Sequence, residues 1–92
     1  MSITLKIVTP AGIVGPLSCD SVRLTLSDDL SERGGGSFGI REGHSKSLLS
    51  LMEGPMEALM EEKIILKGRH GQGFATIENN EVKIIAERFE KE

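Results

Sequence analysis

The stretch Phe74-Ala75-Thr76-Ile77-Glu78-Asn79-Asn80-Glu81-Val82-Lys83-Ile84-Ile85-Ala86 decides the fold class of this chain. On both sides of Asn79-Asn80, apolar residues recur at every second position, which is the period of a β-strand with one buried face. Asparagine tolerates the positive φ angles that a two-residue hairpin turn requires. We therefore predict a β-hairpin over residues 74–86.

Three more strands are predicted in the first third of the chain. Thr4–Thr9 is rich in the β-branched residues that favour strands. Ile13–Cys19 contains Gly15 and Pro16, which restrict that strand to the edge of a sheet or to a bulge. Val22–Leu26 alternates apolar and polar side chains, so we expect a half-buried strand there.

The middle of the chain combines loop, strand and turn signals. Residues 27–36 are polar and rich in glycine, and we expect them to form a mobile surface loop. Ser37–Ile40 is predicted to be a short strand and Arg41–His44 a turn. The leucines at positions 48, 49 and 51 are expected to form the next buried segment.

The segment Pro55–Lys63 carries conflicting signals. Its residues have high helix propensity, and proline is favoured at the first position of a helix. However, Met56, Ala58 and Met60 share one face at the period of a strand, and Ile64-Ile65-Leu66 also favours a strand. Because short strands punctuated by glycine and proline recur along the chain, the pattern predicts an all-β sandwich or barrel.

Length and composition narrow the class of protein. The chain has 92 residues and a net charge of −3, which indicates one domain over residues 1–92 and an oligomer or a subunit of a larger assembly. It has no Trp or Tyr and more acidic than basic residues, so we expect no nucleic-acid partner. No apolar run approaches the ~20 residues that a membrane-spanning helix needs.

Two glycine-rich segments have the composition of phosphate-binding loops. Gly34–Gly39 fits the pattern G-x-G-x-x-G, but polar residues separate it from the preceding strand and no helix pattern follows, so we expect no nucleotide there. Gly68–Gly73 contains Arg69 and His70 but lacks the G-K-[ST] of a P-loop. We interpret it as a flexible connection between two strands, with a phosphate cradle as the alternative.

Cys19, His44 and His70 are the remaining candidates for chemistry. Their spacing fits no metal-ligand pattern, and one cysteine with two histidines is too few for a zinc site without an added carboxylate. We interpret Cys19 as a small buried hydrophobic residue. The alternative is a small β-domain enzyme or ligand-binding module that uses these three side chains. A free-standing homodimer is a further possibility.

The segment Gly36-Ser37-Phe38-Gly39-Ile40-Arg41-Glu42-Gly43-His44 resembles the signature of the epsilon subunit of F-type ATP synthases. Thr4–Thr9 is similar to the opening strand of that family, Leu48-Leu49 to the pair after the histidine, and residues 73–87 to its closing hairpin. The resemblance covers nearly the whole chain. It implies a single flattened β-sandwich of about ten short strands, with strands rather than a helix at residues 55–63.

The resemblance also implies a function. In that family this domain is a non-catalytic part of the central stalk, binds the gamma subunit and contacts the membrane ring of c subunits, and it takes no cofactor or metal. It couples proton or sodium flow to ATP synthesis at the cytoplasmic face of the bacterial inner membrane, as a peripheral component. The implied ring-contacting residues are Ser37, Phe38, Ile40, Arg41, Glu42 and His44, and the implied turn glycines are Gly36, Gly39, Gly43 and Gly54.

The most important departure from that family lies at the end of the sequence. Its members usually continue into a C-terminal helical hairpin that carries an ATP-binding motif and an inhibitory state, whereas this sequence ends at Glu92. We therefore expect no ATP site and no self-inhibition from these residues. The wording of residues 36–41 is also similar to the epsilon subunit of the alternative sodium-linked bacterial ATPases.

Overall fold

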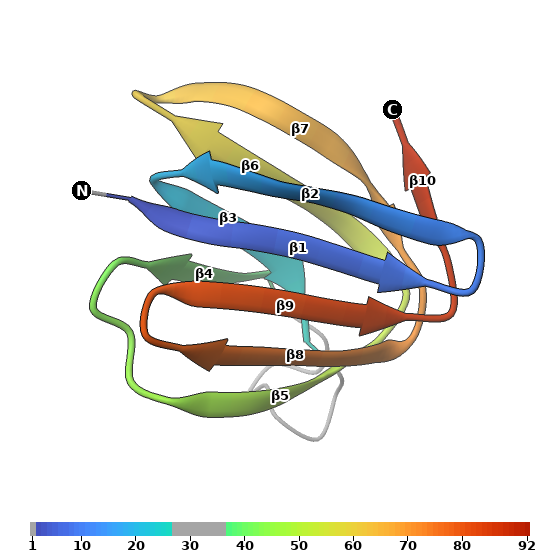
Figure 1. Cartoon of the computed structure of the whole chain (residues 1–92). Helices are drawn as coiled ribbons and strands as arrows, with labels where there is room; N and C mark the ends of the chain where they lie inside the picture. Colours follow the sequence, from blue (N-terminus) through green and yellow to red (C-terminus); the bar gives the residue numbers. More distant parts are fainter. Residues whose placement is uncertain (1, 27–36) are drawn as a thin grey trace.

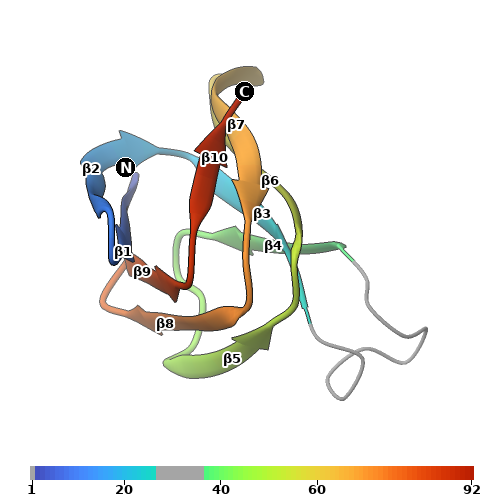
Figure 2. The same cartoon turned by 90° about the vertical axis from the view of Figure 1, so that its right-hand side faces the viewer.

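The computed structural model describes residues 2–26 and 37–92 of the chain. In this part there is no helix, and two five-stranded sheets pack face to face as a β-sandwich (Figures 1 and 2). The sandwich is flattened, with extents of 31 × 29 × 22 Å. The prediction of an all-β sandwich of about ten short strands is therefore confirmed.

Each sheet draws strands from distant parts of the sequence. Sheet A has the order β2 (Gly12–Cys19), β1 (Ile3–Thr9), β9 (Glu81–Ala86), β8 (Gly73–Glu78) and β5 (Ser47–Leu51). Sheet B has the order β10 (Phe89–Lys91), β7 (Lys63–His70), β6 (Gly54–Met60), β3 (Ser21–Thr25) and β4 (Ser37–Arg41). Parallel pairing joins β1 to β9 within sheet A, whereas the last strand, β10, is in sheet B.

The predicted closing hairpin is confirmed. β8 pairs with β9 in antiparallel register, and Glu78 lies opposite Glu81 across the turn. Asn79 and Asn80 have φ angles of 51° and 61°, the left-handed values that a type I′ turn requires at both central positions. The sequence encodes this turn locally because asparagine adopts such angles at little cost.

Residues 55–63 are in β6 and the start of β7, so their helix propensity is overridden. Met56 and Ala58 are buried on the inner face of β6, as the period-2 pattern predicts. The turn between β6 and β7 places Glu61 and Glu62 at φ angles of 52° and 68°. The Asp20 carboxylate accepts a hydrogen bond from the Glu61 N–H at 2.7 Å, which stabilises this unfavourable turn.

Strand β2 lies at an edge of sheet A, as predicted from its glycine and proline. The peptide bond between Gly15 and Pro16 is cis, and the register with β1 shifts between Leu5 and Ile7. A proline and a register shift both protect an edge strand against pairing with another chain.

The prediction that Leu48 is buried is wrong. Leu48 is 68% exposed, whereas Leu51 is buried. Leu48 lies opposite Thr76 on the outer side of sheet A, because alternate residues of β5 point to opposite faces. Because leucines occupy both odd and even positions here, the sequence alone does not show which of them face the core.

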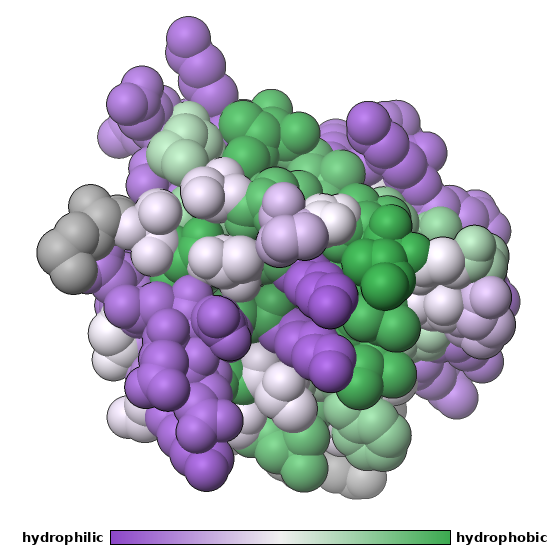
Figure 3. Space-filling view, viewed as in Figure 1, coloured by the Kyte–Doolittle hydropathy of each residue, from purple (hydrophilic) through white to green (hydrophobic). Residues whose placement is uncertain are grey.

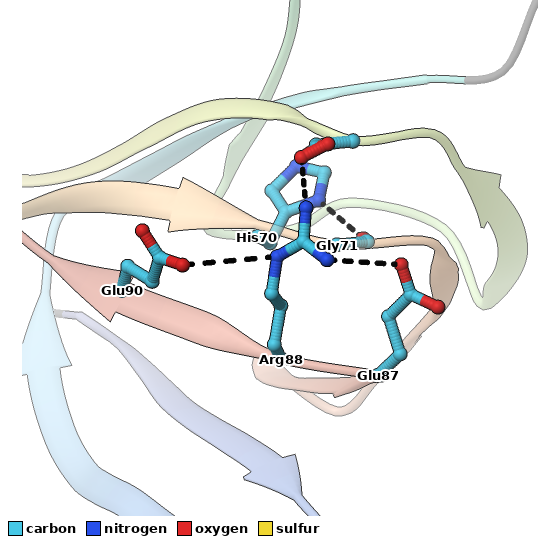
Figure 4. Close-up of polar contacts among 6 residues, drawn as sticks. His70, Gly71, Glu87, Arg88 and Glu90 are labelled. Carbon is cyan, nitrogen blue, oxygen red and sulfur yellow. Dashed lines mark hydrogen bonds and ion pairs between the residues drawn. The ribbon is translucent and has the colours of Figure 1, made fainter.

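The core between the sheets is apolar apart from one histidine in the described residues. His70 is 1% exposed, and its Nε2 accepts a hydrogen bond from the Thr25 N–H at 3.1 Å. Its Nδ1 lies 3.0 Å from the Gly71 carbonyl oxygen, to which it donates (Figure 4). The fully buried apolar side chains include Ile3, Leu5, Ile7, Cys19, Val22, Leu24, Ile40, Ile77 and Ile84.

The segment 68–73 is therefore more ordered than predicted. Residues 68–70 end β7 and Gly73 begins β8, so only Gly71 and Gln72 connect the strands. Beside this connection, Arg88 contacts the carboxylates of Glu53, Glu87 and Glu90 (Figure 4). No phosphate cradle is expected here, because the carboxylates repel an anion and His70 points into the core.

Candidate functional site

The segment 37–44 lies where the chain passes from one sheet to the other. β4 forms an edge of sheet B, and β5 forms an edge of sheet A. Residues 42–46 make the connection between them, and this connection turns at Glu42-Gly43. Gly43 lies in this turn with a φ of 82°, a conformation that favours glycine.

The side chains of this segment differ in exposure. Arg41 and Glu42 are exposed at the tip, and His44 is half-buried behind them. Phe38 packs partly against the core, and its ring meets the His44 ring edge to face at a centroid distance of 5.7 Å. Ile40 is fully buried, so it supports the segment from within the sandwich.

Two of the predicted turn glycines lie outside turns. Gly39 is inside β4, opposite Arg23, and a Cβ added there would meet nothing within 4 Å. Gly54 begins β6, where an added Cβ would collide with the Thr25 side chain. Close approach of β3 therefore explains the glycine at position 54. Gly36 lies outside the described residues, and Ser37 is described only as a strand residue.

Backbone hydrogen bonds hold the turn at residues 41–44. The His44 N–H donates to the Arg41 carbonyl oxygen at 3.2 Å. The Gly43 N–H donates to Oδ1 of Asn80, in the β8–β9 turn, at 2.8 Å. The sequence analysis identified Asn80 only as a turn former, since the partners are 37 positions apart in the sequence.

A polar hollow of about 320 Å³ adjoins Arg41. Arg23 also lines it, and so do Asp20, Glu61 and Glu62 from neighbouring turns. Positive and negative groups are thus interspersed beside the exposed tip. A polar surface of this kind fits a partner that offers both charges, through exposed ion pairs that are individually weak.

The outer face of sheet A carries a row of apolar side chains that the sequence analysis missed. Successive Cα partners across four strands are Ile13, Val8, Ile85 and Phe74. Ile13, Ile85 and Phe74 are 59%, 44% and 54% exposed, and Figure 3 shows apolar atoms spreading over this face. The consecutive isoleucines 84 and 85 indicate such a row, because neighbouring residues of a strand point to opposite faces and both faces of β9 then carry an apolar residue.

A surface hollow of about 440 Å³ runs along this apolar row. Its lining includes Val8, Pro10, Phe74 and Ile85. An exposed apolar row across several strands is uncommon on a free protein and marks a surface for association.

The structure does not gather the three residues of the alternative enzyme hypothesis. Asp20, the neighbour of Cys19, is hydrogen-bonded to Glu61 in the turn before the start of β7. His70 is the last residue of β7, at the opposite end of that strand. Burial raises the pKa of the Cys19 thiol, and the Asp20 charge adds to this effect, so the thiol is a poor nucleophile.

His70 is also unsuited to catalysis, because it is 1% exposed and both of its ring nitrogens are hydrogen-bonded. Burial lowers its pKa, and Arg69 acts in the same direction against the hydrogen bond to Gly71. No group of three His, Cys, Asp or Glu residues in the described chain could hold a metal ion. The described residues also include no helix that is long and apolar enough to cross a membrane.

Comparison with known proteins gives a consistent result. The family described as "ATP synthase, Delta/Epsilon chain, beta-sandwich domain" matches residues 2–92. The ATP synthase epsilon chain of Microcystis aeruginosa is 35% identical over 88 residues, which cover 92% of this chain and 56% of that protein. The chain thus spans about half the length of this curated relative.

Two solved structures share the fold. A chain of the Euglena gracilis mitochondrial ATP synthase, from an assembly of OSCP, F1 and c-ring, is 18% identical with a TM-score of 0.77. The match covers 98% of this chain and 53% of that one. A chain from the central stalk and c-ring of the Tetrahymena thermophila mitochondrial ATP synthase is 14% identical, with a TM-score of 0.74 and coverage of 98% and 66%.

Proposed function

The chain belongs to the family of the ATP synthase delta/epsilon β-sandwich domain, and from this membership we propose that it is a rotor subunit in the central stalk of an F-type ATP synthase. The family match over residues 2–92 is the observation that carries the proposal. In this role the domain catalyses no reaction and needs no cofactor. Its contribution is mechanical, since it links the gamma subunit to the c-ring while ions drive rotation.

The outer face of sheet A is the surface that we assign to the gamma subunit. Phe74, Ile85 and Ile13 lose unfavourable contact with water when a partner covers them. Burial of an apolar side chain of this size contributes about 1.5–3 kcal/mol, reduced here because each is already half-covered. Several such residues in one row therefore contribute a favourable apolar term to the binding of gamma.

The turn at residues 41–44 is the surface that we assign to the c-ring. Arg41 and Glu42 present both charges at its exposed tip, which suits the polar loops of a ring subunit. Phe38 and His44 support the tip through their edge-to-face contact, and Ile40 anchors β4 in the core. Ser37, at the start of β4, completes the predicted contact set.

A rotor subunit must resist shear between its two partners. The two surfaces lie on one sandwich whose sheets share an apolar core, so force applied at one surface reaches the other without a hinge. The complex places the chain at the periphery of the membrane, and for a bacterial enzyme at its cytoplasmic face.

Co-expression with the gamma subunit of the same organism tests the proposal. We expect a stable 1:1 complex in size-exclusion chromatography, with an affinity measurable by titration. The folded chain without any complex would contradict the stalk role. Self-association of the chain in place of that complex would instead assign the apolar row to a homodimer.

A further inference from the structure

We infer that Asn80 is a positioning residue for the ring-contacting turn, an inference that rests on the proposed function of that turn. Asn80 lies in the β8–β9 turn, and the Gly43 N–H donates a hydrogen bond to its Oδ1 at 2.8 Å. The two residues are 37 positions apart in the sequence. A side chain of sheet A therefore holds the backbone of the segment that leaves sheet B.

The backbone of Asn80 is itself firmly placed. Its carbonyl oxygen accepts a hydrogen bond from the Thr4 N–H in β1 at 2.8 Å. Glu78 pairs with Glu81 on either side of the turn, so strands β8 and β9 fix the turn at both ends. The acceptor that Asn80 offers to Gly43 consequently moves with sheet A.

The bond with Asn80 fixes the part of the turn where orientation matters. The Gly43 peptide N–H lies between Glu42 and His44, two of the proposed contact residues. Gly43 has a φ of 82° and no side chain, so its backbone has many alternatives to the observed one. The hydrogen bond to Asn80 selects one of them and thereby sets the direction of both neighbours.

The requirement at position 80 explains the residue type. Its φ of 61° favours asparagine, aspartate or glycine, and of these only asparagine and aspartate also carry an acceptor for the Gly43 N–H. Asn79 has a similar φ of 51° in the same turn. Asn79 therefore serves as a matched control, because its replacement by glycine changes the turn equally and leaves the bond to Gly43 in place.

The bond also joins the two proposed docking surfaces. β8 and β9, which Asn80 connects, carry Phe74 and Ile85 of the apolar row. Displacement of these strands by the gamma subunit would pass through the Asn80 side chain to Gly43. This path runs along β8 and β9 from Phe74 and Ile85 to the Asn79-Asn80 turn and then crosses one hydrogen bond to Gly43.

Amide hydrogen exchange of the whole 92-residue chain, followed by NMR, tests this role directly. With Asn80→Gly we expect the Gly43 amide to exchange about fivefold to tenfold faster, as the loss of one exposed hydrogen bond implies. Asn79→Gly should leave its rate unchanged, and Asn80→Asp should restore it. The core amide of Leu5 serves as the reference for global stability in all three variants.

Equal Gly43 exchange in the Asn80→Gly and Asn79→Gly variants would overturn the inference. A second measurement uses the purified complex with gamma and its binding to c-ring in detergent micelles. We expect Asn80→Gly to weaken ring binding, Asn79→Gly to leave it intact and Asn80→Asp to restore it. Equal ring affinities for all variants would also overturn the positioning role, whereas a wild-type complex that fails to bind the ring would overturn the proposed function.

Discussion

In both sheets, side chains alternate between the core and the outer face. The outer face of sheet A carries an apolar row, whereas the outer face of sheet B carries an ion pair. On sheet A, Ile13, Ile85 and Phe74 lie exposed in one row. On sheet B, Arg23 pairs with Glu57 at 3.3 Å, and Lys67 lies opposite Glu57 in the neighbouring strand. An apolar face can be desolvated at little cost in free energy, so it suits a permanent partner. A face of ion pairs is costly to desolvate and remains stable in water.

The largest expected effect comes from a charge placed in the apolar row. Phe74→Glu combined with Ile85→Lys should lower the affinity for gamma by about 100-fold, because the partner would have to desolvate two charges. Titration of gamma against the double variant measures this loss. Ile64→Glu is the matched control, since Ile64 is 50% exposed but lies opposite Leu59 on the outer face of sheet B. An equal loss in the control would remove the distinction between the faces.

Acid should lower the unfolding free energy through His70, which lies on the inner face of sheet B. Burial lowers the pKa of His70 in sheet B, so the folded chain binds a proton less readily than the unfolded chain. The unfolding free energy is therefore steady above about pH 6.5 and falls as the pH drops below it. Protonation also removes the acceptor that Nε2 offers to Thr25.

Urea denaturation at pH 7.5 and pH 5.0 checks this dependence. His70→Gln should reduce the loss of stability between the two pH values, since glutamine retains an acceptor and does not titrate. His44→Gln is the control, because that ring is half-buried and its Nδ1 lies 2.9 Å from the neighbouring Ser45 carbonyl oxygen. The same pH dependence in both variants would assign the acid sensitivity to carboxylates instead.

Removal of a charge pair from the outer face of sheet B should have a small effect. Arg23→Ala is expected to change the unfolding free energy by less than about 1 kcal/mol, as is usual for an exposed ion pair. The affinity for gamma should not change, because this face is assigned no role in that contact. Parallel measurements of thermal unfolding and gamma binding would detect either departure.

The smallest expected effect concerns the β6–β7 turn. Glu62 has a φ of 68°, so Glu62→Gly should stabilise the chain by about 0.5–1 kcal/mol through relief of the left-handed conformation. Chemical denaturation measures the gain. A loss of stability would mean that the Glu62 side chain makes a compensating interaction.

The hairpins show why part of the fold could be predicted. The Asn79-Asn80 turn carries its conformation in its own residues, so the closing hairpin follows from the sequence alone. The β6–β7 hairpin has glutamates at both turn positions and helix formers before them, so local propensity predicts the wrong structure. Pairing with β3, far away in the sequence, and with β7 stabilises β6 as a strand.

The candidate site shows a similar limit. The motif at residues 36–44 led to the family through resemblance, and the turn at Gly43 was predicted from it. The burial of Ile40, the exposure of Leu48 and the bond from Gly43 to Asn80 depend on which strands become neighbours. The apolar row depends on strand register in the same way, because its members come from four strands.

One measurement tests the assignment of the faces most directly. Phe74→Cys and Ile64→Cys variants can be labelled with a maleimide in the presence and absence of gamma, since buried Cys19 reacts slowly. We predict that gamma protects the cysteine at position 74 and leaves the one at position 64 as reactive as in the free chain. Protection of position 64 with free labelling at position 74 would contradict the account and assign gamma to sheet B.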